Sequence, residues 1–207
     1  MKHHTKILLS AILLGAGLGF GSTGFAEDKT TDAVVDYTTG GITFDPQTGD
    51  PKASLPADLN FGSHEIQSKA DETWVATSDG VQASPVTTGS IAVSDNRGGT
   101  DTGWTVKLLQ ADQFSAGSNE LSGAALSIQA GAVTNNVGSA PTGASIANTT
   151  LDLELGTTAD VLTAQANEGA GETSLALNKF ELFVPKNTNK KQANYQTTLN
   201  WTFSATP

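Results

Sequence analysis

The segment near the end of the chain constrains the fold more than any other. From Tyr195 to Ser204 the residues alternate strictly, and the even positions hold only amides and hydroxyls. A period of two over ten residues predicts a β-strand with one buried and one wet face, whereas a helix would repeat every three or four residues. We expect this strand to be central in its sheet. Its buried face comprises Tyr195, Thr197, Leu199, Trp201 and Phe203.

Other segments repeat the same pattern at intervals. Apolar residues alternate with polar ones in 104–108, 150–155 and 179–184, and more briefly in 91–93 and 126–128. Glycine, asparagine and aspartate turns separate these runs, and 28 threonines and 22 glycines favour strands and turns. The sequence therefore predicts an all-β fold: a single antiparallel β-sandwich or distorted Greek-key barrel of about ten strands. Further strand candidates are 34–37, 42–44 and 73–77.

Helical signals are few. We expect one or two helical turns over Asp160–Asn167, which Gly169 and Gly171 would end, and a single turn over 111–117. Residues 131–144 contain three glycines and a proline, which predicts a long mobile loop. No linker rich in proline, glycine or serine divides the chain after residue 34.

The first 26 residues have the pattern of a secretory signal peptide. Lys2 and Lys6 precede a run of 14 apolar residues, 7–20, and Ala26 closes a stretch of small residues suited to cleavage. The run is shorter than the ~20 residues of a membrane-spanning helix. We therefore expect a signal peptide at 1–26, an N-terminal tail at 27–33, one domain at 34–207, and no membrane span in the exported chain.

Composition excludes several functions. The net charge of −10, which becomes −12 once the two leader lysines are removed, disfavours binding to nucleic acid. Without cysteine there can be no disulfide, catalytic thiol or cysteine-ligated metal. After the leader, His64 is the single histidine, and no nucleophile elbow precedes it. We expect no catalytic residue, no cofactor and no metal, and interpret the acidic turn at 95–101 as a hairpin loop rather than a calcium site.

Three segments carry a family resemblance. Gly103-Trp104-Thr105-Val106 is followed about a hundred residues later by the 195–203 strand, with Pro207 beyond it, and Leu59-Asn60-Phe61-Gly62 precedes both. Together they resemble the WxL domain of bacterial cell-surface proteins over nearly all of 34–207. That family repeats a Trp-x-Leu motif twice, the second time in a YxxxLxWxLxxxP tail. Here Val106 and Phe203 replace the two leucines, and both stay apolar and in phase with their tryptophans.

The resemblance implies a function. It implies a secreted, non-enzymatic protein at the Gram-positive cell surface, attached noncovalently to the wall through peptidoglycan. It further implies docking of larger membrane-anchored surface proteins that carry WxL-binding domains. The motif residues it nominates for peptidoglycan binding are Trp104, Val106, Tyr195, Leu199, Trp201 and Phe203.

The role of the tryptophans can be interpreted in two ways. Trp201 and Trp104 each share a strand face with other apolar residues, which favours a core position with the indole N–H hydrogen-bonded. Alternatively, the indoles form a sugar-stacking surface, and an intermediate arrangement pairs the two strands with both tryptophans at one end of the sheet. Two other functions also stay open: an adhesive or fibre-forming subunit that binds proteins by strand addition, and, with less support, a wall-glycan hydrolase.

Overall fold

The computed structural model describes residues 35, 37, 40–44, 55–98, 102–143 and 146–205. By its contacts the chain divides into two units, Met1–Asp36 and Tyr37–Pro207, and the account below concerns the second. The strand candidate at 34–37 lies largely outside the described residues. In the described part of the chain no helix is long and apolar enough to cross a membrane.

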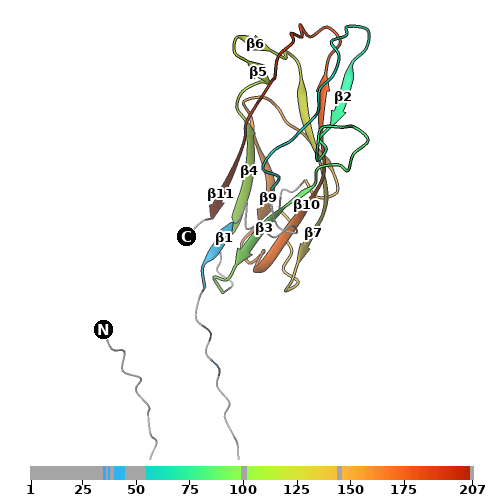
Figure 1. Cartoon of the computed structure of the whole chain (residues 1–207). Helices are drawn as coiled ribbons and strands as arrows, with labels where there is room; N and C mark the ends of the chain where they lie inside the picture. Colours follow the sequence, from blue (N-terminus) through green and yellow to red (C-terminus); the bar gives the residue numbers. More distant parts are fainter. Residues whose placement is uncertain are drawn as a thin grey trace, which may run out of the picture. The chain divides into compact units, whose positions relative to one another are not determined.

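Eleven strands are described, and all of their pairings are antiparallel (Figure 1). They are β1 (Ile42–Phe44), β2 (Glu72–Val75), β3 (Gly89–Asp95), β4 (Trp104–Gln110), β5 (Ser115–Ala116), β6 (Asn119–Glu120), β7 (Ala125–Asn135), β8 (Thr150–Asp152), β9 (Thr158–Ala164), β10 (Gly171–Val184) and β11 (Leu199–Ala205).

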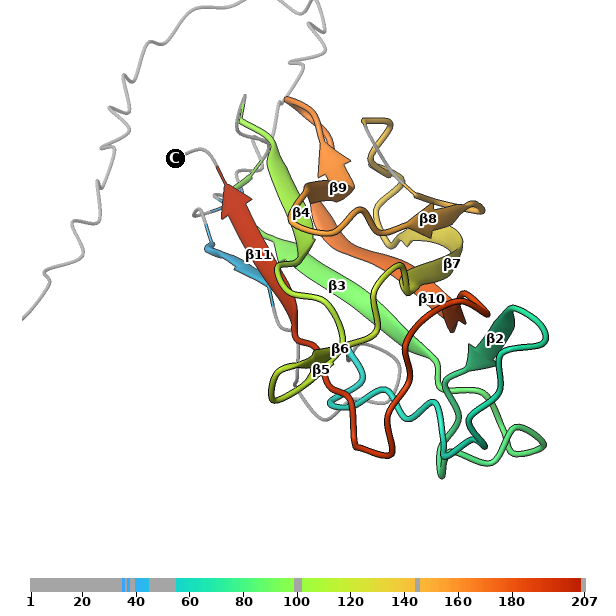
Figure 2. The same cartoon turned by 90° about the horizontal axis from the view of Figure 1, so that it is seen from above.

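The strands form two main sheets. One has the order β1-β3-β10-β7-β8, with β2 added beside the C-terminal half of β10, and the other has the order β11-β4-β9. Their inner faces share one apolar core, which includes Val93, Val106, Leu108, Leu162 and Leu175, each no more than 1 % exposed. Figure 2 shows the two sheets from above. The predicted antiparallel sandwich is therefore confirmed, and its sheets do not close into a barrel.

The C-terminal strand is at an edge, so the expectation of a central strand is wrong. β11 pairs with β4 on one side and with no other strand among the described residues. Alternation of side chains reports which faces of a sheet are wet and which are buried. It carries no information about the hydrogen-bonding direction within the sheet, and strand order depends on that direction.

The helix expected over 160–167 is also wrong, because most of that segment forms β9. β9 pairs with β4, but the register shifts so that Val106 faces Leu162 while Lys107 faces Asp160. The extra residue, Val161, belongs to a β-bulge, and both Val161 and Leu162 are fully buried. Two consecutive buried residues break the period of two, which hides the strand from periodicity analysis.

The end of β7 is hidden from periodicity analysis by two shifts in its register with β10. The predicted mobile loop at 131–144 is wrong for its first five residues, which continue β7 along β10. Ala130 and Gly131 are both buried where the register with β10 shifts. A Cβ on Gly131 would lie 2.9 Å from Nδ2 of Asn178, so glycine permits the close approach of the two strands.

Candidate functional site

The two motif strands pair directly. β4 and β11 align so that Val106 faces Phe203, Trp104 faces Ala205 and Leu108 faces Trp201. The two tryptophans therefore lie four register positions apart. The expected pairing of the strands is present, but the arrangement with both indoles at one end of the sheet is not.

Burial separates the two motifs. Trp104 is 2 % exposed and Val106 is fully buried, so the first motif belongs to the core. The residues of the second motif are half-buried and pack against that core from the edge of the sandwich; they are Tyr195, Leu199, Trp201 and Phe203. Neither indole is a freely exposed sugar-stacking surface.

Phe203 lies in an aromatic cluster that sequence analysis missed. Its ring stacks on Phe44 with centroids 5.5 Å apart and lies 6.3 Å from the ring of Trp104. Phe44 reaches this position from β1, the short edge strand of the other sheet. The cluster thus links the first and last described strands of the domain across its two layers, and an aromatic ring at 203 suits this contact.

Two glycines shape the surroundings of Trp104. A Cβ on Gly103 would lie 2.1 Å from the carbonyl oxygen of Ala164, and a Cβ on Gly169 would lie 2.7 Å from Trp104 Nε1. Gly169 also has φ of +73°, a conformation that favours glycine. The indole N–H of Trp104 is buried and finds no hydrogen-bond partner among the described residues, so the expected partner is not found there.

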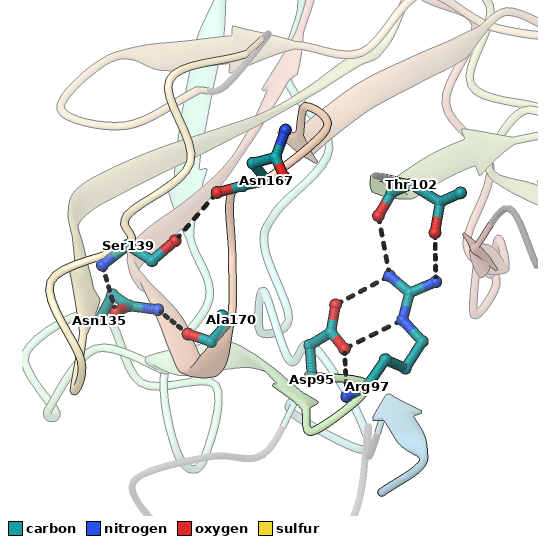
Figure 3. A network of polar contacts seen from close by, with 7 residues as sticks. All are labelled: Asp95, Arg97, Thr102, Asn135, Ser139, Asn167 and Ala170. Carbon is teal, nitrogen blue, oxygen red and sulfur yellow. Dashed lines mark hydrogen bonds and ion pairs between the residues drawn. The ribbon is translucent and has the colours of Figure 1, made fainter. Parts of the chain in front are cut away.

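An ion pair closes the loop between β3 and β4 (Figure 3). The Arg97 guanidinium donates to both carboxylate oxygens of Asp95, at 3.0 and 2.8 Å, and to the side-chain and backbone oxygens of Thr102, both at 3.1 Å. Burial alone would raise the pKa of the Asp95 carboxyl, but the hydrogen bonds from Arg97 outweigh it and hold that pKa below its usual range. β3 and β4 belong to different sheets, so this loop is a corner and not the expected hairpin.

This arrangement bears on the calcium alternative. The Arg97 N–H donates to Asp95 Oδ1 at 3.1 Å, which forms the Asx-turn expected of a structural loop. The Asp95 carboxylate is also paired with the Arg97 guanidinium, a cation of its own chain. Within the described ranges, no three histidine, aspartate or glutamate side chains gather as a metal site; residues 99–101 lie outside those ranges.

A second polar network lies at the same end of the sandwich. The side-chain amide of Asn135 donates to the Ala170 carbonyl, while its oxygen accepts the N–H of Ser139 (Figure 3). The same amide also donates to Thr173 Oγ1. It thereby joins the loops that follow β7 and β9. These bonds fix the turns that cover Trp104, which gives the network a structural role.

At the opposite end of the domain lie β2, β5 and β6 (Figure 1), and the residues around them line a concave surface. There, a groove of about 2240 Å³ is lined by the loop 55–66, by β2, by the end of β10 and by the strap, which we define as residues 185–198 between β10 and β11. Phe180, Leu182 and Val184 form part of its lining. No strand of the smaller sheet lines this half of β10 except the start of β11, so loops cover it instead.

Side-chain bonds hold the groove walls together. Lys190 Nζ on the strap lies 2.8 Å from Glu72 Oε2 and donates to the Gln67 carbonyl at 2.9 Å. The Gln82 amide pairs with both the N–H and the carbonyl of Val75, as a neighbouring strand would. The ring of His64 stacks on that of Trp74, with the ring centroids 3.4 Å apart.

The chain also matches a known protein family. Residues 28–207 match the family described as WxL domain surface cell wall-binding. The chain belongs to the WxL domain family. It is therefore a cell-surface protein that binds the cell wall, and its family is one of wall-binding domains rather than of enzymes. No curated protein and no solved structure matches the chain significantly.

In this WxL domain the burial of the motif residues indicates a structural role for both motifs. Trp104 and Val106 belong to the core of the sandwich, and Trp201 and Phe203 cover that core from the edge strand β11. The groove was missed because its walls are loops without periodicity. One signal for it was present: the polar even positions continue upstream of the last strand through Gln196, Asn194 and Gln192.

Acidification should destabilise this WxL domain. Burial alone would raise the pKa of Glu72, but the hydrogen bonds from Lys190 and Gln67 outweigh it and lower that pKa, as Arg97 does for Asp95. A carboxyl with a lowered folded pKa stabilises the fold above its unfolded pKa of about 4. That contribution is lost as the pH falls through the folded value. Urea midpoints should therefore fall between pH 5 and pH 3.

A matched variant checks the origin of this dependence. Asp95→Asn cannot titrate at 95, so its loss of stability between pH 5 and pH 3 should be smaller than that of the wild type. A midpoint that does not change over this range in the wild type would contradict the prediction.

Proposed function

We propose that this WxL domain attaches noncovalently to peptidoglycan and catalyses no reaction on it. The observation that carries the proposal is the groove, whose buried charges are neutralised within the domain: Glu72 pairs with Lys190. A chain of net charge −10 is repelled by polyanionic wall polymers such as teichoic acids. Peptidoglycan is the wall polymer that this surface suits best.

Two carboxylates of the groove, Glu72 and Asp79, support a binding role over hydrolysis. A glycosidase general acid needs a raised pKa. Glu72 is ion-paired, and Asp79 accepts hydrogen bonds from the Val81 N–H and the Ser84 hydroxyl, which lower its pKa. Both shifts have the wrong direction for a proton donor at neutral pH.

Co-sedimentation with purified sacculi tests the proposal. The purified protein should pellet with peptidoglycan stripped of teichoic acid and release no reducing sugar from it. Protein that stays in the supernatant would refute wall binding through peptidoglycan. Loss of turbidity that is abolished by Glu72→Gln or Asp79→Asn would instead support the hydrolase.

A second candidate, docking of a partner protein by strand addition, is favoured by the edge position of β11. Charged residues and prolines usually protect an exposed edge strand from pairing with another chain. The seven residues of β11, Leu199–Ala205, include neither. Membrane-anchored WxL-associated surface proteins are the partners we propose for this edge. Ser204→Lys keeps both the buried face and the backbone ladder with β4 and adds a charge to the edge, so a partner pull-down that it abolishes would support this candidate.

A further inference from the structure

The strap presents a row of polar, uncharged side chains beside the groove. Gln192, Asn194, Gln196 and Thr198 are all exposed, and all line the groove. Their side chains make no hydrogen bond within the part of the chain that the structure describes. Four amides and hydroxyls with free donors and acceptors are therefore available to a ligand.

The backbone of the strap is fixed before any ligand arrives. Gln196 exchanges two backbone hydrogen bonds with Ser115, both 2.9 Å long. The Thr197 hydroxyl donates to the Asp112 carbonyl at 2.6 Å, and the Tyr195 hydroxyl accepts the Lys191 N–H at 2.8 Å. Because the backbone of the strap is already ordered, little backbone entropy is lost on binding, and the ordering cost is confined to the side chains.

The chemistry of the lining selects the class of ligand. Amides and hydroxyls donate and accept at once, as the hydroxyl and acetamido groups of wall sugars do. The stacked rings of His64 and Trp74 add an aromatic surface to the same wall. Stem peptides carry free carboxylates and ammonium groups. The more buried charges of the groove, Glu72 and Lys190, neutralise each other, so among the described lining residues only the exposed side chains of Asp58, Glu65, Asp79 and Lys191 are left to meet such charges.

The size of the groove points to a polymer. Its volume of about 2240 Å³ exceeds the roughly 300–1,000 Å³ of a typical small-molecule site. Resting on the proposed attachment to peptidoglycan, we propose that the groove binds the glycan strand of that polymer, with the amides of Gln192 and Asn194 on its N-acetylated sugars. The glycan would then lie across the loop-covered end of the sandwich, away from Trp104.

Amidase digestion of sacculi supplies the probes, because it releases glycan strands free of peptide and stem peptides free of sugar. Titration calorimetry should show that the purified protein binds the glycan strands. The double variant Gln192→Ala/Asn194→Ala should bind them about tenfold more weakly, as expected for two lost hydrogen bonds. The matched control Gln129→Ala/Asn187→Ala removes two exposed amides outside the groove lining and should bind as the wild type does.

The outcomes separate this inference from the proposed function. Wild-type protein that pellets with sacculi but binds only stem peptides would overturn the glycan assignment and leave peptidoglycan attachment intact. Equal glycan affinity of the groove variant and the wild type would overturn the assignment to the groove. Failure to bind either sacculi or glycan would overturn both. An unchanged thermal midpoint of the variant shows that any lost affinity is not lost folding.

Discussion

Replacing Trp104 by alanine should lower the free energy of unfolding by about 3–5 kcal/mol, the range for large-to-small changes in a core. The indole is 2 % exposed and lies between Phe203 and the backbone of Gly169. Such a loss is a large part of the ~5–15 kcal/mol that stabilises a typical domain. Urea denaturation followed by tryptophan fluorescence and circular dichroism would measure it.

Trp201→Ala is the matched comparison. Its side chain is half-buried on an edge strand, so we expect a clearly smaller loss of stability. Sequence analysis alone treats the two indoles as equivalent. The structure predicts the larger loss of stability for the change in the first motif, because Trp104 is the more buried of the two. Equal urea midpoints for Trp104→Ala and the wild type would show that the first motif is not a core element.

Arg97→Ala should also lower the free energy of unfolding, by less than the about 3–5 kcal/mol that removing one partner of a fully buried ion pair costs, because both side chains keep some contact with water. The Asp95 side chain is 8 % exposed, and its carboxylate would be left without a cation. The bonds from the guanidinium to Thr102, which fasten the corner between the sheets, would be lost as well.

A double-mutant cycle isolates the pair. Asp95→Ala/Arg97→Ala should be less destabilised than the sum of the single variants, because the double variant leaves no uncompensated buried charge. Additive losses would contradict a coupled pair. Arg97→Lys keeps the charge but not the two-pronged geometry, and its stability should fall between those of the wild type and Arg97→Ala.

The faces of the strands could be predicted from the sequence wherever the period of two is unbroken. The alternation around Trp104, Ile91 and Phe180 predicts the buried faces of β4, β3 and the end of β10 correctly. It fails at bulges, where neighbouring residues such as Val161 and Leu162 are both buried. A bulge depends on the register of a distant partner strand, so one strand considered alone does not reveal it.

The candidate site was less predictable than the fold. The motif tryptophans could be found from their spacing, but their position, core or rim, depends on strand order, which side-chain alternation does not encode. Contacts such as Lys190 with Glu72 join residues more than a hundred positions apart through irregular loops. No local pattern marks such a pair, because coil segments have no periodicity from which a facing side could be inferred.

Within β10 the buried side chains switch from odd to even positions, so the two halves of the strand pack against different parts of the domain. Before the irregularity its odd residues Thr173, Leu175 and Leu177 are buried, and after it the even residues Phe180, Leu182 and Val184 are buried. The even set lines the groove, and the odd set does not. Loop sequences around the groove can therefore diverge, or be grafted from one domain to another, while the tryptophan layer keeps its own packing.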